Sequence, residues 1–255
     1  MAKAPNPFAG DADYLGPISA TPQKMVETML ELAGVGPGDV VYDLGCNDGR
    51  VCITAARDRG ARGVGVEIDQ GAVDKARRLV RDAPARAPRS RLTTSISPLS
   101  IAPASPSSSL PADFISTPSI PRRRSSQADE AGVASLVDIR LGNAVAEPLT
   151  DATVTFVYLL PKGNAKVSRK LMRELKPGTL VMTYVFRLPA DHWDAHLERV
   201  EAIKSTRDRA SGGVDASAYN KIYAYRVPEF KPAWCEENPE DGDDRGDRDA
   251  GGVRV

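Results

Sequence analysis

The stretch Val40-Val-Tyr-Asp43-Leu-Gly45-Cys-Asn47-Asp48-Gly49-Arg50 decides the fold of this chain. Its first half is apolar almost without a break, which is typical of a strand buried on both faces of a parallel sheet. Its second half is a glycine-containing turn, from which a helix is predicted to run over 48–59. A glycine turn directly after a strand lets a ligand approach the backbone without interference from a Cβ atom. The stretch therefore predicts a strand, a ligand-binding turn and a helix in succession.

The same alternation continues on both sides of this stretch. Thr21 is expected to cap a helix that has Pro22 in its first position and ends at Gly34. Asp69 is expected to cap another helix, which buries Val73, Ala76, Leu79 and Val80. The predicted helices are 22–33, 48–59, 69–81 and 162–175, and the predicted strands are 39–44, 63–67, 135–141, 152–160, 179–186, 199–205 and 221–227. This order predicts an α/β fold with a doubly wound, Rossmann-like sheet that is mostly parallel and has an antiparallel C-terminal pair.

Two segments do not fit this pattern, and they set the domain count. Of the 32 residues from Ser95 to Ser126, 17 are serine or proline. Such a stretch buries too little apolar surface to offset its ordering entropy, so 82–130 is predicted to be a disordered insertion. Residues 229–255 form a charged stretch without hydrophobic periodicity and are predicted to be a disordered tail. The remainder predicts a single domain over 12–228, interrupted by the insertion.

Composition excludes several classes of protein. The 34 Lys and Arg balance the 34 Asp and Glu, so the chain is a poor match for nonspecific nucleic-acid binding. The negative charge of the acidic tail offsets a mildly basic core in this net charge, however. An acidic protein or RNA therefore remains open as a substrate. A membrane span needs ~18 consecutive apolar residues, and the sequence has no such run.

Cysteine and histidine usage points to no disulfide framework and no metal site. The three cysteines lack zinc spacing and suit a reducing compartment. His192 and His196 have metal-ligand spacing on a helix, but no third ligand accompanies them, so an exposed polar face is favoured and no metal is predicted. Cys46 is interpreted as a small loop residue and not as a nucleophile. The first residues lack an apolar leader, and the cytoplasm is the expected location, with the mitochondrion as the alternative.

The acidic residue before the turn indicates the kind of ligand. A dinucleotide site would favour a Gly-x-Gly-x-x-Gly turn facing a pyrophosphate. Here Asp43 precedes Gly45-x-Asn47-x-Gly49, and a carboxylate beside the turn suits a cationic ligand better. S-adenosylmethionine carries a sulfonium and an ammonium group and no phosphate. The turn therefore favours this cofactor over NAD.

At these residues the sequence resembles the class I S-adenosylmethionine-dependent methyltransferases over nearly the whole predicted core. Asp43, Gly45, Asn47 and Gly49 match the first motif of that family, which wraps the methionine part of the cofactor. Asn47 replaces a usual glycine, but asparagine tolerates a positive φ. The resemblance implies that Glu67, at the end of the second strand, accepts hydrogen bonds from the ribose hydroxyls.

Two further features of the family can be carried over. Asn143 follows the third core strand, where relatives carry an aspartate that meets the adenine amino group. Tyr158 and Asn164 flank the end of the fourth core strand, where relatives place groups on the substrate side. A buried core position for Tyr158 and helix capping for Asn164 are the alternatives.

A closer resemblance concerns one subgroup. It contains the lysine methyltransferases of the mitochondrial ATP synthase c-subunit and the adenine nucleotide translocator, with bacterial relatives. The segments that carry it are 37–45, 154–161 and 174–179, together with Pro22 and its helix. Those mitochondrial enzymes have a hydrophobic targeting segment that is not found in this sequence.

The sequence therefore predicts an enzyme that transfers a methyl group from S-adenosylmethionine by in-line displacement, with a protein lysine as the expected acceptor. Such a reaction depends on positioning and on exclusion of water, so it needs no acid–base triad. A non-catalytic interaction module that keeps this fold is one alternative. An NAD-dependent oxidoreductase is the other. The oligomeric state is left open.

Overall fold

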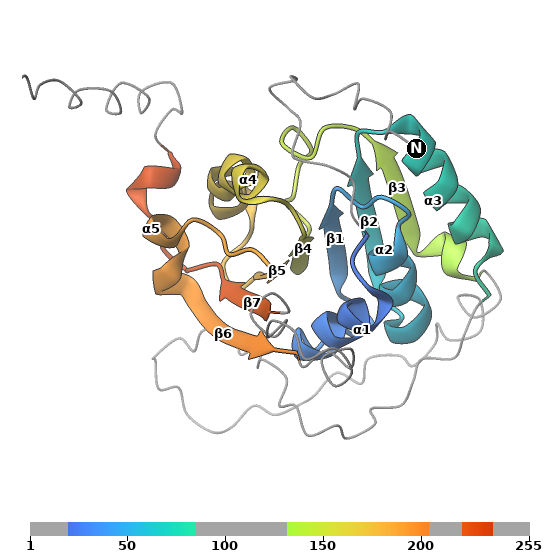
Figure 1. The fold of residues 1–255 in the computed structure, drawn as a ribbon, viewed down its shortest axis with the longest axis horizontal. Helices are drawn as coiled ribbons and strands as arrows, with labels where there is room; N and C mark the ends of the chain where they lie inside the picture. The colour runs from blue at the N-terminus through green and yellow to red at the C-terminus, as the bar shows by residue number, and fades with distance from the viewer. Residues whose placement is uncertain (1–19, 85–131, 204–220, 237–255) are drawn as a thin grey trace, which may run out of the picture.

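A seven-stranded sheet forms the centre of the molecule (Figure 1). This computed structural model describes residues 20–84, 132–203 and 221–236. The strand order is β3-β2-β1-β4-β5-β7-β6. The first five strands of this order pair in parallel, and β7 pairs antiparallel with both β5 and β6, which confirms the predicted fold class. The strands are β1 (Val40–Leu44), β2 (Arg62–Glu67), β3 (Val137–Leu141), β4 (Val154–Val157), β5 (Leu180–Tyr184), β6 (Leu197–Ala202) and β7 (Lys221–Arg226).

Helices cover both faces of the sheet, and the alternation of side chains along β1 shows this. Val41 packs in one core cluster with α1 and with part of α2, whereas Tyr42 and Leu44 pack on the other face with α4. A third cluster joins α2 and α3 to β3 through Ile139. The helices are α1 (Gln23–Leu32), α2 (Arg50–Thr54) with a π-helical continuation η1 (Ala55–Arg59), α3 (Gln70–Asp82), α4 (Pro161–Glu174) and α5 (Ala190–Trp193); the short 3-10 turns are η2 (Val133–Ser135), η3 (Asp194–His196) and η6 (Ala233–Cys235).

Two glycines in β2 allow α2 and its preceding loop to lie close to the sheet. A Cβ atom on Gly63 would stand 2.7 Å from Cα of Cys52, and one on Gly65 would stand 2.7 Å from Sγ of Cys46. Both distances are far shorter than any ordinary contact of a Cβ atom. The glycines therefore bring the loop after β1 down onto β2, where its amides can bond to the strand.

Two predictions about the helix ends are confirmed, and two other predictions about the helices are wrong. Gly34 ends α1 with φ 66°, and the carboxylate of Asp69 accepts a hydrogen bond from the Ala72 amide at 2.7 Å, so these two predictions are confirmed. The predicted cap at Thr21 is wrong, because α1 begins at Gln23 and Pro22 takes the cap position without a side-chain bond. The predicted burial of Leu79 is also wrong, since it is 41% exposed. The buried stripe of α3 is narrower than its apolar pattern and excludes that position.

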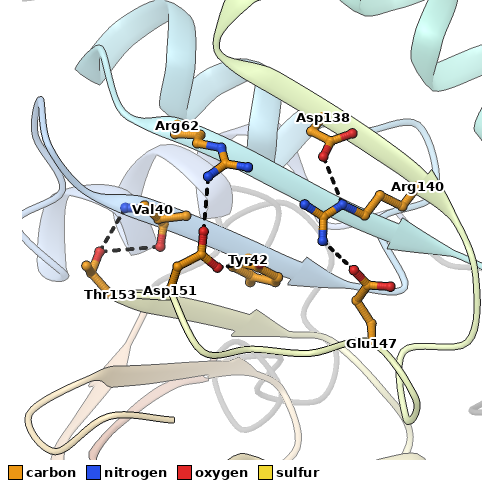
Figure 2. Close-up of polar contacts among 8 residues, drawn as sticks. All are labelled: Val40, Tyr42, Arg62, Asp138, Arg140, Glu147, Asp151 and Thr153. Carbon is orange, nitrogen blue, oxygen red and sulfur yellow. Dashed lines mark hydrogen bonds and ion pairs between the residues drawn. The ribbon is translucent and has the colours of Figure 1, made fainter. Parts of the chain in front are cut away.

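Strand β4 is shorter than predicted. The connection that leads to it contains no helix and is held in place by polar contacts. Residues 142–153 cross from β3 to β4 in turns alone. Asp151 accepts hydrogen bonds from Tyr42 (2.6 Å) and Arg62 (3.0 Å), and Thr153 bonds to the backbone of Val40 (Figure 2). The guanidinium of Arg140 lies between Asp138 and Glu147 in the same view. Burial and the Asp151 contact raise the pKa of Tyr42 to about 12.

The packed domain extends beyond the predicted boundary at residue 228. Cys235 is fully buried in the core cluster beneath α4, and Lys231 donates hydrogen bonds to the carbonyls of Met172 and Leu175 at the end of that helix. The prediction that the tail begins at residue 229 is therefore wrong, because residues 229–236 belong to the packed domain. Apolar side chains such as Trp234 attach this segment despite its charge. Residues 237–255 and most of the predicted 82–130 insertion lie outside the described residues.

No helix among residues 20–84, 132–203 and 221–236 combines the length and the apolar character that crossing a membrane requires.

Candidate cofactor site

Five parallel strands end at one edge of the sheet, and the predicted site residues gather there. Chain connections reverse direction between β1 and β4, which lie side by side. Ligands of doubly wound sheets bind in the crevice outside the carboxyl ends of the strands at such a reversal. Asp43 and Glu67 lie at the ends of β1 and β2, and Asn143, Tyr158 and Val185 follow β3, β4 and β5.

The turn after β1 adopts the backbone that its sequence predicts. Gly45, Asn47 and Gly49 have φ values of 81°, 48° and 71°. Asn47 thus has the positive φ that the sequence analysis expects asparagine to tolerate there. The amides of Gly45 and Cys46 both donate to the Val66 carbonyl of β2, at 2.9 and 3.0 Å. The turn is thus fixed against β2.

Glu67 joins this turn to the end of β2. Its carboxylate accepts hydrogen bonds from the backbone amides of Asn47 (2.8 Å), Ile68 (2.9 Å) and Asp69 (3.1 Å). A carboxylate has about four acceptor positions, so at least one remains for a hydroxyl group of a ligand. Glu67 therefore both fixes the loop and can accept a further hydrogen bond at the edge of the sheet.

Asp43 is a buried carboxyl group that has no hydrogen-bond donor among the residues that the structure describes. It is 7% exposed. Burial, together with the nearby carboxylates of Glu67 and Asp48, raises its pKa to about 7. Burying an unpaired carboxylate is costly unless a donor or a cation meets it. This buried carboxyl group thus fits a ligand with a positive charge, as S-adenosylmethionine has.

Asp48 and Arg50 form a contact that the sequence analysis missed. Asp48 is 6% exposed and accepts two hydrogen bonds from the Arg50 guanidinium, at 2.6 and 2.8 Å. Lys75 of α3 lies 3.5 Å from the same carboxylate. The Arg50 hydrogen bonds hold the pKa of Asp48 below its ordinary value. The opposite charges of Asp48 and Arg50, two residues apart in the sequence, could have indicated this contact.

Asn143 lies beside the same edge, but its side chain is already engaged. The amide of Gly142 donates to the Glu67 carbonyl at 2.9 Å, which places the loop after β3 next to the end of β2. The side-chain oxygen of Asn143 accepts a hydrogen bond from the Val145 amide at 2.9 Å. One acceptor position on that oxygen remains for a ligand.

Tyr158 and Asn164 come from the same edge but have different surroundings. Tyr158 is half-buried, and its ring centroid lies 5.0 Å from that of Tyr184. Asn164 is 1% exposed, and its side-chain amide donates to the carbonyls of Phe186 (3.3 Å) and Arg187 (2.9 Å). The predicted alternative of helix capping is thus wrong for Asn164, because its side chain bonds to another segment.

The two histidines do not converge. The ring of His192 stacks on Trp234 with centroids 4.1 Å apart, while His196 meets the edge of Trp193. Within the described parts of the chain, no three metal-ligating side chains come together. The thiol of Cys46 is buried against β2, and burial raises its pKa.

Comparison with known proteins adds to this geometry. No family model matches the chain. A protein-lysine N-methyltransferase from Saccharolobus islandicus (strain REY15A) is 32% identical over 216 residues, which span 84% of this chain and 96% of that protein. The crystal structure of an RNA methyltransferase from Salinibacter ruber, in complex with S-adenosyl-L-homocysteine, is 31% identical. It aligns with a TM-score of 0.55 over 84% of this chain and 97% of that one.

Both relatives are described as methyltransferases, and this chain aligns with nearly the full length of each. The second is bound to S-adenosyl-L-homocysteine, the demethylated form of the cofactor. Their likeness to this chain agrees with the unpaired Asp43 carboxyl group and the glycine turn beside it. The chain therefore belongs to the class I S-adenosylmethionine-dependent methyltransferases, and S-adenosylmethionine is its cofactor.

Proposed function

We propose that this methyltransferase transfers the methyl group to lysine side chains of proteins. The observation that carries the proposal is the 32% identity with the protein-lysine N-methyltransferase from Saccharolobus islandicus, which extends over 96% of that protein. The sequence resemblance to the subgroup that contains the mitochondrial lysine methyltransferases and their bacterial relatives points the same way, and membership of that subgroup is part of the proposal.

In this proposal the two carboxyl groups at the ends of β1 and β2 hold the cofactor. S-adenosylmethionine supplies an electrophilic methyl group on a sulfonium. Asp43 meets the positively charged methionine part, and Glu67 accepts from the ribose hydroxyls with the acceptor position that its backbone contacts leave open. Asn143 accepts from the adenine amino group. Gly45, Asn47 and Gly49 let the backbone approach the ligand.

The acceptor then approaches across β4 and β5. Leu159 lies within 3.5 Å of the position that a Cβ atom on Gly45 would take, so the loop after β4 borders the cofactor turn. Tyr158 and Tyr184 follow on that side. A lysine must be neutral when it attacks, and a site that removes water from its ammonium group lowers its pKa. These half-buried and buried rings would exclude water there.

Methyl transfer to a whole-cell extract, which contains both protein and RNA, tests the proposal. The extract comes from cells that lack this gene, and the full chain is added with S-adenosylmethionine labelled in the methyl group. We expect labelled protein whose hydrolysate contains methyl-lysine. The Asp43→Ala variant should lose the labelling, whereas Asp74→Asn, which removes an exposed carboxylate from α3, should keep it. Labelled protein without methyl-lysine would refute the lysine acceptor.

A second candidate acceptor is RNA, because the similar Salinibacter ruber protein is described as an RNA methyltransferase. The same assay separates the two acceptors. Label that ribonuclease releases and protease does not would establish RNA. If the chain binds S-adenosylhomocysteine but labels neither, the non-catalytic interaction module gains support.

A further inference from the structure

The chain makes a strained turn directly after β5, at the edge that holds the cofactor site. Val185 has φ 67°, a conformation that is a genuine outlier for a β-branched residue. The Phe186 amide donates to the Tyr184 carbonyl at 2.8 Å, so residues 184–186 form a γ-turn of the rare type with positive φ. Strained backbone of this kind persists only where surrounding contacts hold it, and it gathers at functional sites.

Asn164 of α4 holds the residues that follow the turn. Its side-chain amide donates to the carbonyls of both Phe186 and Arg187. Its side-chain oxygen is buried and has no partner among the described residues. A buried polar atom without a partner lowers stability. Stability alone therefore does not explain an asparagine at this position.

The turn also carries one ring of the aromatic pair. Tyr184 begins the γ-turn and is 5% exposed, and its ring packs against the half-buried Tyr158 at 5.0 Å. The loop with Tyr158 continues through Leu159, which borders the cofactor turn at Gly45. A continuous series of contacts thus runs from Asn164 through the turn and the Tyr184–Tyr158 pair to the loop that borders Gly45.

We propose that Asn164 is a positioning residue, which holds the strained turn 184–186 and through it sets the Tyr158–Tyr184 pair against the incoming acceptor. The acceptor side of this inference rests on the proposed function. It replaces the predicted direct contact of Asn164 with substrate by an action through the backbone of residues 184–187.

The Asn164→Ala variant tests this, with Ser168→Ala as its matched control. Ser168 lies one turn further along α4, is 1% exposed, and accepts a hydrogen bond from the Trp193 indole at 3.0 Å. Both changes remove hydrogen bonds between α4 and the segment after β5: Asn164→Ala removes two, and Ser168→Ala removes one. We expect Asn164→Ala to raise the KM for the acceptor on the order of tenfold. A 1 Å displacement of a group that positions a substrate can lower the reaction rate ~100-fold, and a loosened turn should have a smaller effect. The affinity for S-adenosylhomocysteine should stay unchanged in both variants.

A second substitution tests the strain itself. Asparagine tolerates a positive φ better than valine. Adding Val185→Asn to Asn164→Ala should therefore recover part of the lost acceptor affinity, an outcome that a general loss of packing would not produce. If Asn164→Ala fails to fold, the Asn164→Ser variant is compared with Ser168→Ala in its place.

Hydrogen exchange of the Phe186 amide gives a readout that needs no acceptor. Exchange should accelerate in Asn164→Ala and stay unchanged in Ser168→Ala. Unchanged exchange, or an equal rise of the acceptor KM in both variants, would overturn the positioning role. Methylation of RNA instead of lysine would refute the proposed function but not the positioning role of Asn164. The effect of Asn164→Ala on the KM for RNA would then test that role.

Discussion

The Asp43→Asn variant should stabilise the chain without cofactor and weaken its binding of cofactor at the same time. The carboxyl group of Asp43 is 7% exposed, and burial beside Glu67 and Asp48 raises its pKa from 3.8 to about 7. The folded chain therefore binds more protons than the unfolded chain between these two values. Its free energy of unfolding should fall as the pH rises through this window.

The magnitude follows from the pKa shift. A shift from 3.8 to about 7 corresponds to about 4 kcal/mol once the group is ionised in both states. The asparagine variant escapes this penalty but buries an amide without a partner, which costs about 1–3 kcal/mol. At about pH 8 we expect a net gain of about 1–3 kcal/mol, and at about pH 5 no gain.

Urea unfolding at the two pH values measures the gain, and calorimetric titration with S-adenosylhomocysteine measures the affinity. Loss of a charge-assisted contact should weaken binding by about 1–3 kcal/mol. Asp74→Asn removes an equal charge from the exposed face of α3 and should change stability by less than about 0.5 kcal/mol. If Asp43→Asn is no more stable than the wild type at the higher pH, the account of this carboxyl group is wrong.

Three further substitutions test other parts of the structure. Glu67→Gln keeps the shape of the side chain but weakens the contacts to three backbone amides, so cofactor affinity measured by calorimetry should fall ~10- to 100-fold. Gly63→Ala should destabilise the chain by about 1–3 kcal/mol in urea because its Cβ atom would meet α2, whereas Gly36→Ala, with open space around it, should not. Lys231→Met removes the hydrogen bonds to the end of α4 and should lower Tm while methyl transfer is retained; loss of both together would contradict this separation.

Local patterns were sufficient to predict the sheet and the first turn of the site. Val41 and its neighbours form a short apolar run next to glycines, and that pattern alone defines a buried strand followed by a turn. The positive φ at Asn47 also followed from the residue type. The cap at Asp69 depends on atoms three residues apart, which a sequence pattern captures well.

Features that depend on contacts between distant segments escaped prediction. The close approach of Gly63 to Cys52 depends on the final backbone positions. The strained backbone at Val185 contradicts the preference of valine, so no local rule could indicate it. The attachment of residues 229–236 was missed because the many charged residues after 236 dominated the composition of the whole 229–255 stretch.

The position of β7 between β5 and β6 has a consequence for the newly made chain. Strand β6 is synthesised before β7, and β7 is its one partner among the described strands. The edge of β5 therefore stays open, with unpaired backbone groups, until Arg226 has left the ribosome. An open strand edge is the kind of surface on which nascent chains associate wrongly. A chain that ends before β7 would thus contain the first six strands but would expose the edge of β5 and be prone to aggregate.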